Sequence, residues 1–382
     1  MKSISNTIRN PKLFGVIIAA LILSLNSAFA AENIHNVYRS VRASGLGGVT
    51  LTTGQYDENF FGNPARLSAD PNWKVGLPDP TIEINSSLMN FASALTGGKA
   101  TSTDGIAKSL KDYSGKYIHA RVETTFPSVF LPNFRGTKMS YAIGLLTSFS
   151  TDLGVLQQYS IDPQIVVDAA PTLLVSRKFL AAEELAVGVS MGVAYRLSSG
   201  KSFGLPDLFT GTSLSPKDNG GDGGHFDFGI GATYDLPWKL VGWDLASSFA
   251  FNNILGGAYT NLPLNLVNTG NKPREQPRKI GLGVAMKKPE LWKFNSTVIA
   301  LELQDIGNNT NGSLFRLLHL GAETKWKIIS IRTGVNQGYL CAGLGFDLKA
   351  LQLDFATFGE EMALNTGSFE NRIYSLRLGF QI

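Results

Sequence analysis

Hydrophobic and polar residues alternate one by one along much of this chain. From about residue 81 onward, runs with this period of two are separated by clusters of Gly, Pro, Asn, Asp and Ser. Neighbouring side chains of a β-strand point to opposite faces, so each run predicts a strand with one apolar face. Fourteen strands are predicted, at 81–87, 116–126, 137–149, 165–178, 184–196, 226–236, 241–251, 278–287, 294–304, 315–326, 328–336, 340–348, 350–358 and 372–382.

The last of these runs continues to the final residue. A soluble protein seldom leaves such a face at an unprotected terminus, because it promotes aggregation. In an outer-membrane barrel, one face contacts lipid and the other faces the lumen. The run also resembles the terminal signal that such barrels present to their assembly machinery, with Ile382 where Phe is usual. One face carries Tyr374, Leu376, Leu378, Phe380 and Ile382, and the other carries Ser375, Arg377, Gly379 and Gln381.

The connections between the predicted strands alternate in length. Most connections after odd-numbered strands are long, as at 88–115 and 197–225, and those after even-numbered strands are shorter, as at Lys327 and Lys349. Outer-membrane barrels have long extracellular loops and tight periplasmic turns. The even strand number and this asymmetry predict an all-β fold, a closed antiparallel transmembrane β-barrel of about 14 strands. The last predicted strand, 372–382, is expected to pair with the first, 81–87.

The tryptophans fit the same orientation. Trp238, Trp243, Trp292 and Trp326 lie in or beside predicted periplasmic turns. Indole prefers the boundary between lipid and water, so they indicate the aromatic girdle of an outer-membrane barrel. Packing of each indole in a soluble core is the alternative.

Composition agrees with a membrane barrel and excludes some other classes. Charged residues make up only 17% of the chain, with 41 Gly and a net charge of +4. There is no basic cluster with interleaved aromatic residues, so nucleic acid is not an expected partner. The basic start, the apolar run Leu13 to Leu25 and Ala28-Phe29-Ala30 predict a signal peptide. The expected organisation is a signal peptide at 1–30, a plug or hatch at 31–72 and the barrel at 73–382.

Candidate chemistry is sparse. His35, His119, His225 and His319 are far apart in the sequence, so neither a metal site nor a cofactor is predicted. A hydrolase built on a strand histidine is the minor alternative. The segment Asp218–Gly224 is expected to be a flexible extracellular loop. Charges inside strands are expected to face the lumen, namely Arg121, Glu123, Arg196, Asp227, Arg278, Glu302, Glu323, Arg332, Asp347, Asp354 and Arg377.

Several motifs resemble a known superfamily. The run Ser40–Val49, followed by Asn63-Pro64-Ala65-Arg66-Leu67, resembles the start of mature FadL-type and PorV-type outer-membrane proteins, with Arg66 in place of the usual Gly. Leu320–Glu323, Arg332–Tyr339 and Phe358–Glu361 resemble a plasmid-transfer TraF-like or uncharacterised branch. The resemblance implies a barrel with an N-terminal hatch.

The resemblance also implies two functions. FadL-type proteins import long-chain fatty acids or other hydrophobic molecules, which leave laterally through a gap made by a kinked strand. PorV-type relatives bind protein cargo during secretion. We expect passive, hatch-gated uptake of a hydrophobic small molecule across the outer membrane of a Gram-negative bacterium, without enzymatic activity. The alternative is a protein-binding or secretion-associated barrel without small-molecule transport.

The candidate site residues form two groups. The expected hatch residues are Gly45, Gly47, Gly48, Phe60, Phe61, Asn63, Pro64, Ala65 and Arg66. The expected extracellular landing residues are Phe91, Leu95, Leu255, Leu262 and Leu264, in the apolar loops 89–112 and 252–277. A continuous apolar tunnel that ends at a lateral gap would favour transport. A sealed lumen under a broad apolar loop platform would favour protein binding.

Overall fold

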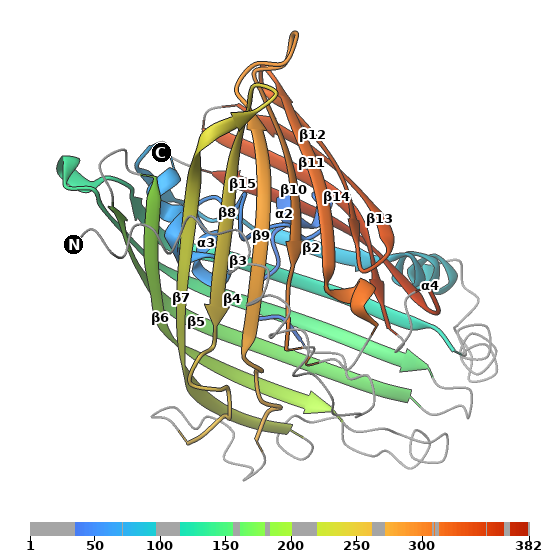
Figure 1. The fold of residues 1–382 in the computed structure, drawn as a ribbon. Coiled ribbons are helices and arrows are strands. Elements are labelled where there is room, and N and C mark those ends of the chain that lie inside the picture. Colours follow the sequence, from blue (N-terminus) through green and yellow to red (C-terminus); the bar gives the residue numbers. More distant parts are fainter. Residues whose placement is uncertain are drawn as a thin grey trace.

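The strands form one antiparallel sheet that closes into a barrel (Figure 1). The computed structural model describes residues 35–70, 72–96, 115–155, 161–179, 184–200, 220–261, 272–307, 309, 313–348, 350–362 and 367–380. The strands are β1 (Lys74–Gly76), β2 (Thr81–Asn85), β3 (Tyr117–Leu131), β4 (Met139–Val155), β5 (Ile161–Phe179), β6 (Leu185–Gly200), β7 (Gly220–Leu240), β8 (Trp243–Asn252), β9 (Lys279–Lys288), β10 (Ser296–Leu303), β11 (Leu318–Trp326), β12 (Ile329–Asn336), β13 (Tyr339–Asp347), β14 (Leu351–Glu361) and β15 (Glu370–Phe380).

Closure occurs where the sequence predicts it. Strand β15 pairs with β2, with Leu376 opposite Ile82. All fourteen predicted strands are present, as β2 to β15. The short β1 and β2 both pair with β3, next to 128–130 and 120–123 respectively, so they are two pieces of one interrupted strand. The closed antiparallel barrel of fourteen strands is therefore confirmed.

Two local expectations were wrong. The segment Gly220–Gly224 is not a flexible loop, because its residues pair with β6 as the first part of β7. Partner-strand hydrogen bonds override the local preference of a glycine run for irregular structure. Arg278 precedes β9 and is exposed instead of facing the lumen. Asp347, the last residue of β13, lines a cavity of the lumen as expected, although it is exposed there.

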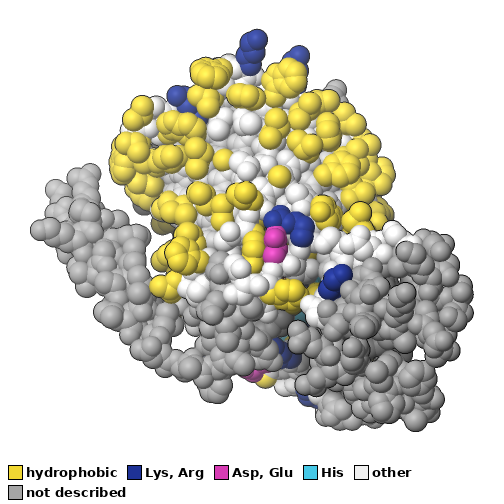
Figure 2. Space-filling view, turned by 90° about the vertical axis from the view of Figure 1, so that its right-hand side faces the viewer, with side chains coloured by type: hydrophobic (Ala, Val, Ile, Leu, Met, Phe, Trp, Pro, Cys, Tyr) yellow, Lys and Arg dark blue, Asp and Glu magenta, His cyan; other side chains and the backbone are white. Residues whose placement is uncertain are grey.

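The two faces of the sheet differ in chemistry. On β15, Tyr374, Leu376 and Phe380 are exposed, whereas Ser375 and Arg377 are buried. Figure 2 shows hydrophobic side chains gathered over the upper part of one face of the molecule. Because a closed barrel leaves no unpaired strand edge and this exterior is apolar, the structure confirms the predicted location in the outer membrane. No helix in the described part of the chain is long and apolar enough to span a membrane.

The turn end of the barrel carries the tryptophans. Trp238, Trp292 and Trp326 are 55%, 95% and 45% exposed beside the β7–β8, β9–β10 and β11–β12 turns. The sequence pattern did not include Trp73, which stacks on Phe134 in the β3–β4 turn at a centroid distance of 5.7 Å. An exposed indole at each of these turns is typical of the periplasmic girdle.

The inside of the barrel is filled by residues 35–70, which we call the luminal segment. It contains helix α2 (Val41–Gly45), helix α3 (Glu58–Phe61) and the 3-10 helix η1 (Pro64–Ala69). Figure 1 shows α2 and α3 enclosed by the strands. Helix α4 (Ser86–Thr96) lies outside the lumen, after β2.

Candidate functional site

The luminal segment touches the barrel wall through glycines. Cβ atoms added to Gly47 and Gly48 would lie 2.2 Å from Leu320 O and 2.6 Å from His319 Nδ1. Both glycines also have positive φ values, 71° and 84°, which other residues rarely adopt. A Cβ on Gly45 would lie 2.9 Å from Gly343 Cα. Gly47 and Gly45 therefore bring the segment against the backbone of β11 and β13, and Gly48 packs on the His319 side chain.

The Asn-Pro-Ala motif holds the opposite side of the segment. Asn63 Oδ1 accepts from Ala65 N, and its Nδ2 donates to Leu51 O at 2.9 Å and to Thr233 Oγ1 at 3.2 Å. Pro64 begins η1, and the backbone N–H that proline lacks would have no hydrogen-bond partner within the helix at this position. The motif caps a helix and bonds the segment to β7 with the same side chain.

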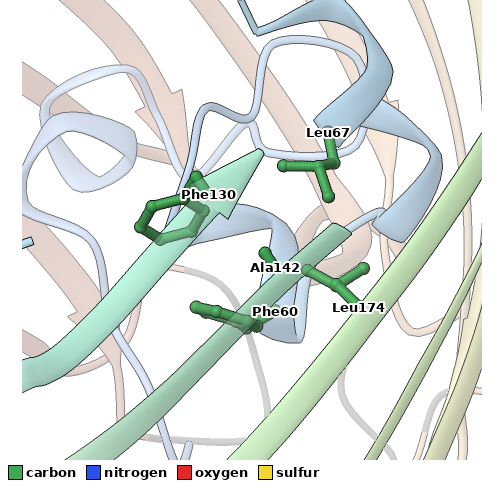
Figure 3. Packing of buried hydrophobic residues seen from close by; sticks show 5 residues of the cluster. All are labelled: Phe60, Leu67, Phe130, Ala142 and Leu174. Carbon is green, nitrogen blue, oxygen red and sulfur yellow. The ribbon is translucent and has the colours of Figure 1, made fainter. Parts of the chain in front are cut away.

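An aromatic cluster lies between the segment and strands β3 to β5. Phe60 and Leu67 of the segment pack on Phe130, Ala142 and Leu174 of the wall (Figure 3). The adjacent Phe61 stacks on Tyr38 at 5.6 Å. Sequence reasoning had assigned both phenylalanines to the hatch, and the structure brings them together on one side of the lumen.

The other side of the segment is held by buried ion pairs. Arg42 of α2 donates to Glu58 at 2.9 Å and to Glu323 of β11 at 2.7 Å. Arg332 of β12 joins the same network through Glu323 at 2.8 Å and Asp354 at 2.6 Å. All five side chains are at most 5% exposed, so these charges are paired out of contact with water.

Glu58 separates two cavities in the lumen. A cavity of about 250 Å³ opens toward the long loops, and one of about 290 Å³ opens toward the short turns. Glu58 lines both, and its carboxylate accepts from Ser40 Oγ, Arg42 and Gln55 N. Within the described residues, the two cavities are closed from each other by a hydrogen-bonded carboxylate, and no continuous apolar tunnel passes through the lumen.

The wall itself is interrupted at one place. Gly76 of β1 pairs with Ser128 and Thr81 of β2 pairs with Glu123, so residues 77–80 and 124–127 face each other without ladder pairs. Residues 77–80 read Leu-Pro-Asp-Pro, and proline has no N–H to donate to a ladder. In β3, the register also shifts between Thr125 and Ser128, on either side of Pro127.

Asp79 bridges this interruption. Its Oδ1 accepts from Thr124 Oγ1 and Thr125 N, both at 2.7 Å, and its Oδ2 accepts from Arg377 at 2.7 Å. Arg377 also pairs with Asp57 of the luminal segment at 3.1 Å. One guanidinium therefore connects the wall interruption to the luminal segment.

The interruption lies at the level of the aromatic cluster. Thr125 pairs with Leu146, which packs near Phe61, and Ser128 pairs with Gly144. A Cβ on Gly144 would lie 2.8 Å from the Phe60 ring. A cavity of about 90 Å³, lined in part by Phe60, Phe61 and Tyr38, lies beside this cluster.

An apolar groove lies on the outer wall over β2 and strands β12 to β15, on the side of β2 away from β3. Its volume is about 570 Å³, and its lining includes Ile82 and Ile84 of β2, Tyr374 and Leu376 of β15 and Phe355 of β14. The groove begins one residue beyond Thr81, where the interruption ends.

Of the five expected landing residues, Leu255 is the one whose side chain the structure describes. Phe91 and Leu95 lie on α4, and the described part of the chain does not include their side chains. Leu255 follows β8 and is 64% exposed. Leu262 and Leu264 lie outside the described residues.

Some candidate residues were not found from the sequence. Leu314, in a predicted connection, and Phe315, the first residue of the predicted strand 315–326, are each 67% exposed and both lie in the short 3-10 helix η3 (Leu314–Leu317). Asp79 was not selected, although prolines on both of its sides indicate a strand interruption. Glu58 gave no local signal, because its neighbours across the lumen come from distant parts of the sequence.

Comparisons with known proteins found similarity only in solved structures. No family model and no curated protein matches the chain. The Pseudomonas putida toluene transporter TodX aligns at 10% identity over 92% of this chain and 99% of that chain, with a TM-score of 0.49. A TodX deltaS2S3 mutant, described as a monoaromatic hydrocarbon channel, aligns at 11% identity over 90% and 98%, also with 0.49. The Ralstonia pickettii toluene transporter TbuX aligns at 10% identity over 89% and 96%, with 0.47.

These structures are FadL-family outer-membrane barrels, the family that the N-terminal motifs resemble. At these scores and identities, nothing about the ligand of this chain follows from them. The architecture described above rests on the strand pairing of the chain itself.

Proposed function

We propose that this barrel takes up a hydrophobic small molecule, of the long-chain fatty acid class, passively across the outer membrane. The luminal segment acts as the hatch, and the molecule leaves sideways through the wall interruption at residues 77–80. The observation that carries the proposal is the coincidence of this interruption with the aromatic cluster inside the wall and the apolar groove outside it.

The chemistry along this route suits an apolar solute. The inner side offers Phe60, Phe61 and Tyr38, and the outer side offers an apolar groove that continues into lipid. The direct route toward the short turns is blocked by Glu58 and its three donors. On that route an apolar molecule would break these charge-assisted hydrogen bonds and could not form new ones in their place. The lateral route ends in the lipid, in which an apolar molecule dissolves.

Gating follows from the shared guanidinium. Arg377 holds Asp79 in the wall and Asp57 in the luminal segment at the same time. A shift of the segment that displaces Asp57 changes the partners of Arg377, and this loosens Asp79 from the interruption. A molecule that binds at the aromatic cluster and shifts the luminal segment would thereby open the wall interruption.

The test is uptake by whole cells, in which the outer membrane is the barrier. A Gram-negative strain without its own fatty acid channel would express the full chain, and uptake of radiolabelled oleate would be measured beside a hydrophilic dye. We expect oleate uptake above the vector control without dye entry. Deletion of residues 36–70 should admit the dye, because the hatch is lost. Oleate uptake equal to that of the vector control would refute the proposal.

A protein-binding role is the second candidate, and the closure at Glu58 favours it. Exposed Leu255, Leu314 and Phe315 lie at the long-loop end of the barrel. If this role is correct, the same strain should show no oleate uptake, and an envelope protein should co-purify with the barrel. Replacing the three residues with Ser should abolish that co-purification.

A further inference from the structure

The cavity at the short-turn end of the lumen is unusually rich in charge. Its volume is about 290 Å³, and it adjoins the aromatic cluster through Tyr56. Its cationic lining comprises Arg42, Arg66, Lys74, Lys325, Arg332 and Arg377, and its acidic lining comprises Asp57, Glu58, Asp70, Asp347 and Asp354.

The buried acids of this cavity already have partners. Asp57 pairs with Arg377, Glu58 with Arg42 and Asp354 with Arg332. Asp70 accepts from Tyr56 N at 3.0 Å and from Asn59 Nδ2 at 3.2 Å. Asp347 is exposed at the rim. The buried acids are thus held without the three remaining cations, Arg66, Lys325 and Lys74, and the Lys74 ammonium lies over the Tyr56 ring.

Arg66 is the exceptional group. Its side chain is only 7% exposed, and its Nε has no hydrogen-bond partner. Within the described residues, neither Arg66 nor Lys325 forms an ion pair. Burial lowers the pKa of Arg66, and Asp70 and Asp235 offset this only by longer-range attraction.

A buried guanidinium without a partner is unfavourable, because it loses hydration and gains no hydrogen bond. Arginine presents a planar fork of donors that fits the two oxygens of a carboxylate or phosphate. We propose that Arg66 and Lys325 form a binding site for a small oxyanion, carboxylate or phosphate, in the cavity at the short-turn end of the lumen. The site faces the periplasmic side, so its ligand enters from the periplasm and need not cross the barrel.

The position of Arg66 in the chain supports a ligand role over a structural one. It follows Asn63-Pro64-Ala65, which already caps η1 and bonds the segment to β7. Within the described residues, the Arg66 guanidinium forms no ion pair and its Nε no hydrogen bond with this anchor, so a small side chain there would leave the anchor intact. The long, cationic side chain of Arg66 instead lines the cavity, where it can bind a ligand.

The experiment is calorimetric titration of the detergent-purified full chain. The probes are sodium phosphate, sodium butyrate and, as a neutral control, butanol. We expect binding of at least one anion, weakened by salt, and no binding of butanol. Arg66→Gln should weaken anion binding about tenfold or more, and Lys325→Gln should weaken it less, because Lys325 is only half-buried. Arg372→Gln, at a partly exposed arginine of β15 that does not line the cavity, should leave binding unchanged.

Each outcome decides the proposal. Binding of phosphate alone or of butyrate alone identifies the oxyanion, and binding of both assigns a general oxyanion site. If the chain binds neither phosphate nor butyrate, the proposed site is refuted. It is also refuted if Arg66→Gln binds the anion with wild-type affinity. Heat-modifiable migration in gels verifies that each variant is folded, and Arg66→Lys, which keeps the charge, should retain more affinity than Arg66→Gln.

Discussion

Replacement of Arg377 by Gln tests the connection between the wall and the luminal segment. Arg377 is 7% exposed and bonds Asp79 at 2.7 Å and Asp57 at 3.1 Å. Removing it leaves two buried carboxylates without their cation. Loss of one partner from a buried pair costs about 3–5 kcal/mol. We therefore expect the free energy of opening of the luminal segment to fall by about 3 kcal/mol, which is about a hundredfold rise in the open population.

The measurement is amide hydrogen exchange followed by mass spectrometry on the detergent-purified chain. Peptides that contain Tyr56 and Asp57 should exchange about a hundredfold faster in Arg377→Gln than in the wild type. Peptides from β10 and β11, far from this pair, should be unchanged. Melting of the whole barrel would instead accelerate all peptides together.

Arg372→Gln is the matched control. Arg372 lies on the same strand and pairs with Glu370, but the two side chains are 27% and 35% exposed. Exposed pairs contribute about 0–1 kcal/mol, so exchange should change less than about fivefold. If Arg377→Gln accelerates the segment no more than Arg372→Gln does, Arg377 does not hold the segment to the wall.

Two further substitutions test how the luminal segment packs against the barrel wall. A Cβ on Gly188 would lie 2.4 Å from Pro64 C, so Gly188→Ala should destabilise docking of the segment by about 1–3 kcal/mol. Gly154→Ala is the control, because its Cβ would meet only atoms 3.7 Å or more away. The rate of proteolytic cleavage of the segment measures both effects, and equal rates in the two variants would contradict the close approach of Gly188 and Pro64. Burial lowers the pKa of His35 to about 4, against a partial opposing effect of Asp168. The unfolded His35 titrates near 6.5, so its stabilising contribution is complete above that pH and is lost as pH falls toward 4. The protection factor of amides near residue 36, which is corrected for the intrinsic pH dependence of exchange, should fall between pH 7 and pH 5 more in the wild type than in His35→Gln. Identical changes of the protection factor with pH would exclude this role.

The sequence alone determined the barrel and the direction of its faces. Period-two alternation is a local property, because each side chain points opposite to the next whatever the strand pairs with. This is why Leu376 and Arg377 could be assigned to lipid and lumen from the last run alone. The order of long and short connections indicates that each strand pairs with the next one in the sequence. The first and last strands are then left at the two edges of the sheet, so closure of the barrel requires that β15 pair with β2.

Only the tertiary structure decided which charges meet. Asp57, Asp79 and Arg377 come from the luminal segment, the wall interruption and the last strand, and their contact depends on the register of closure. A shift of one residue would turn Arg377 toward lipid, and no local pattern records the register. The same holds for Glu58, which closes the lumen, and for Arg66, whose burial without a partner appears only when the segment is placed inside the barrel. Glycine-rich Gly220–Gly224 also depended on long-range pairing, because only its β6 partner makes it a strand.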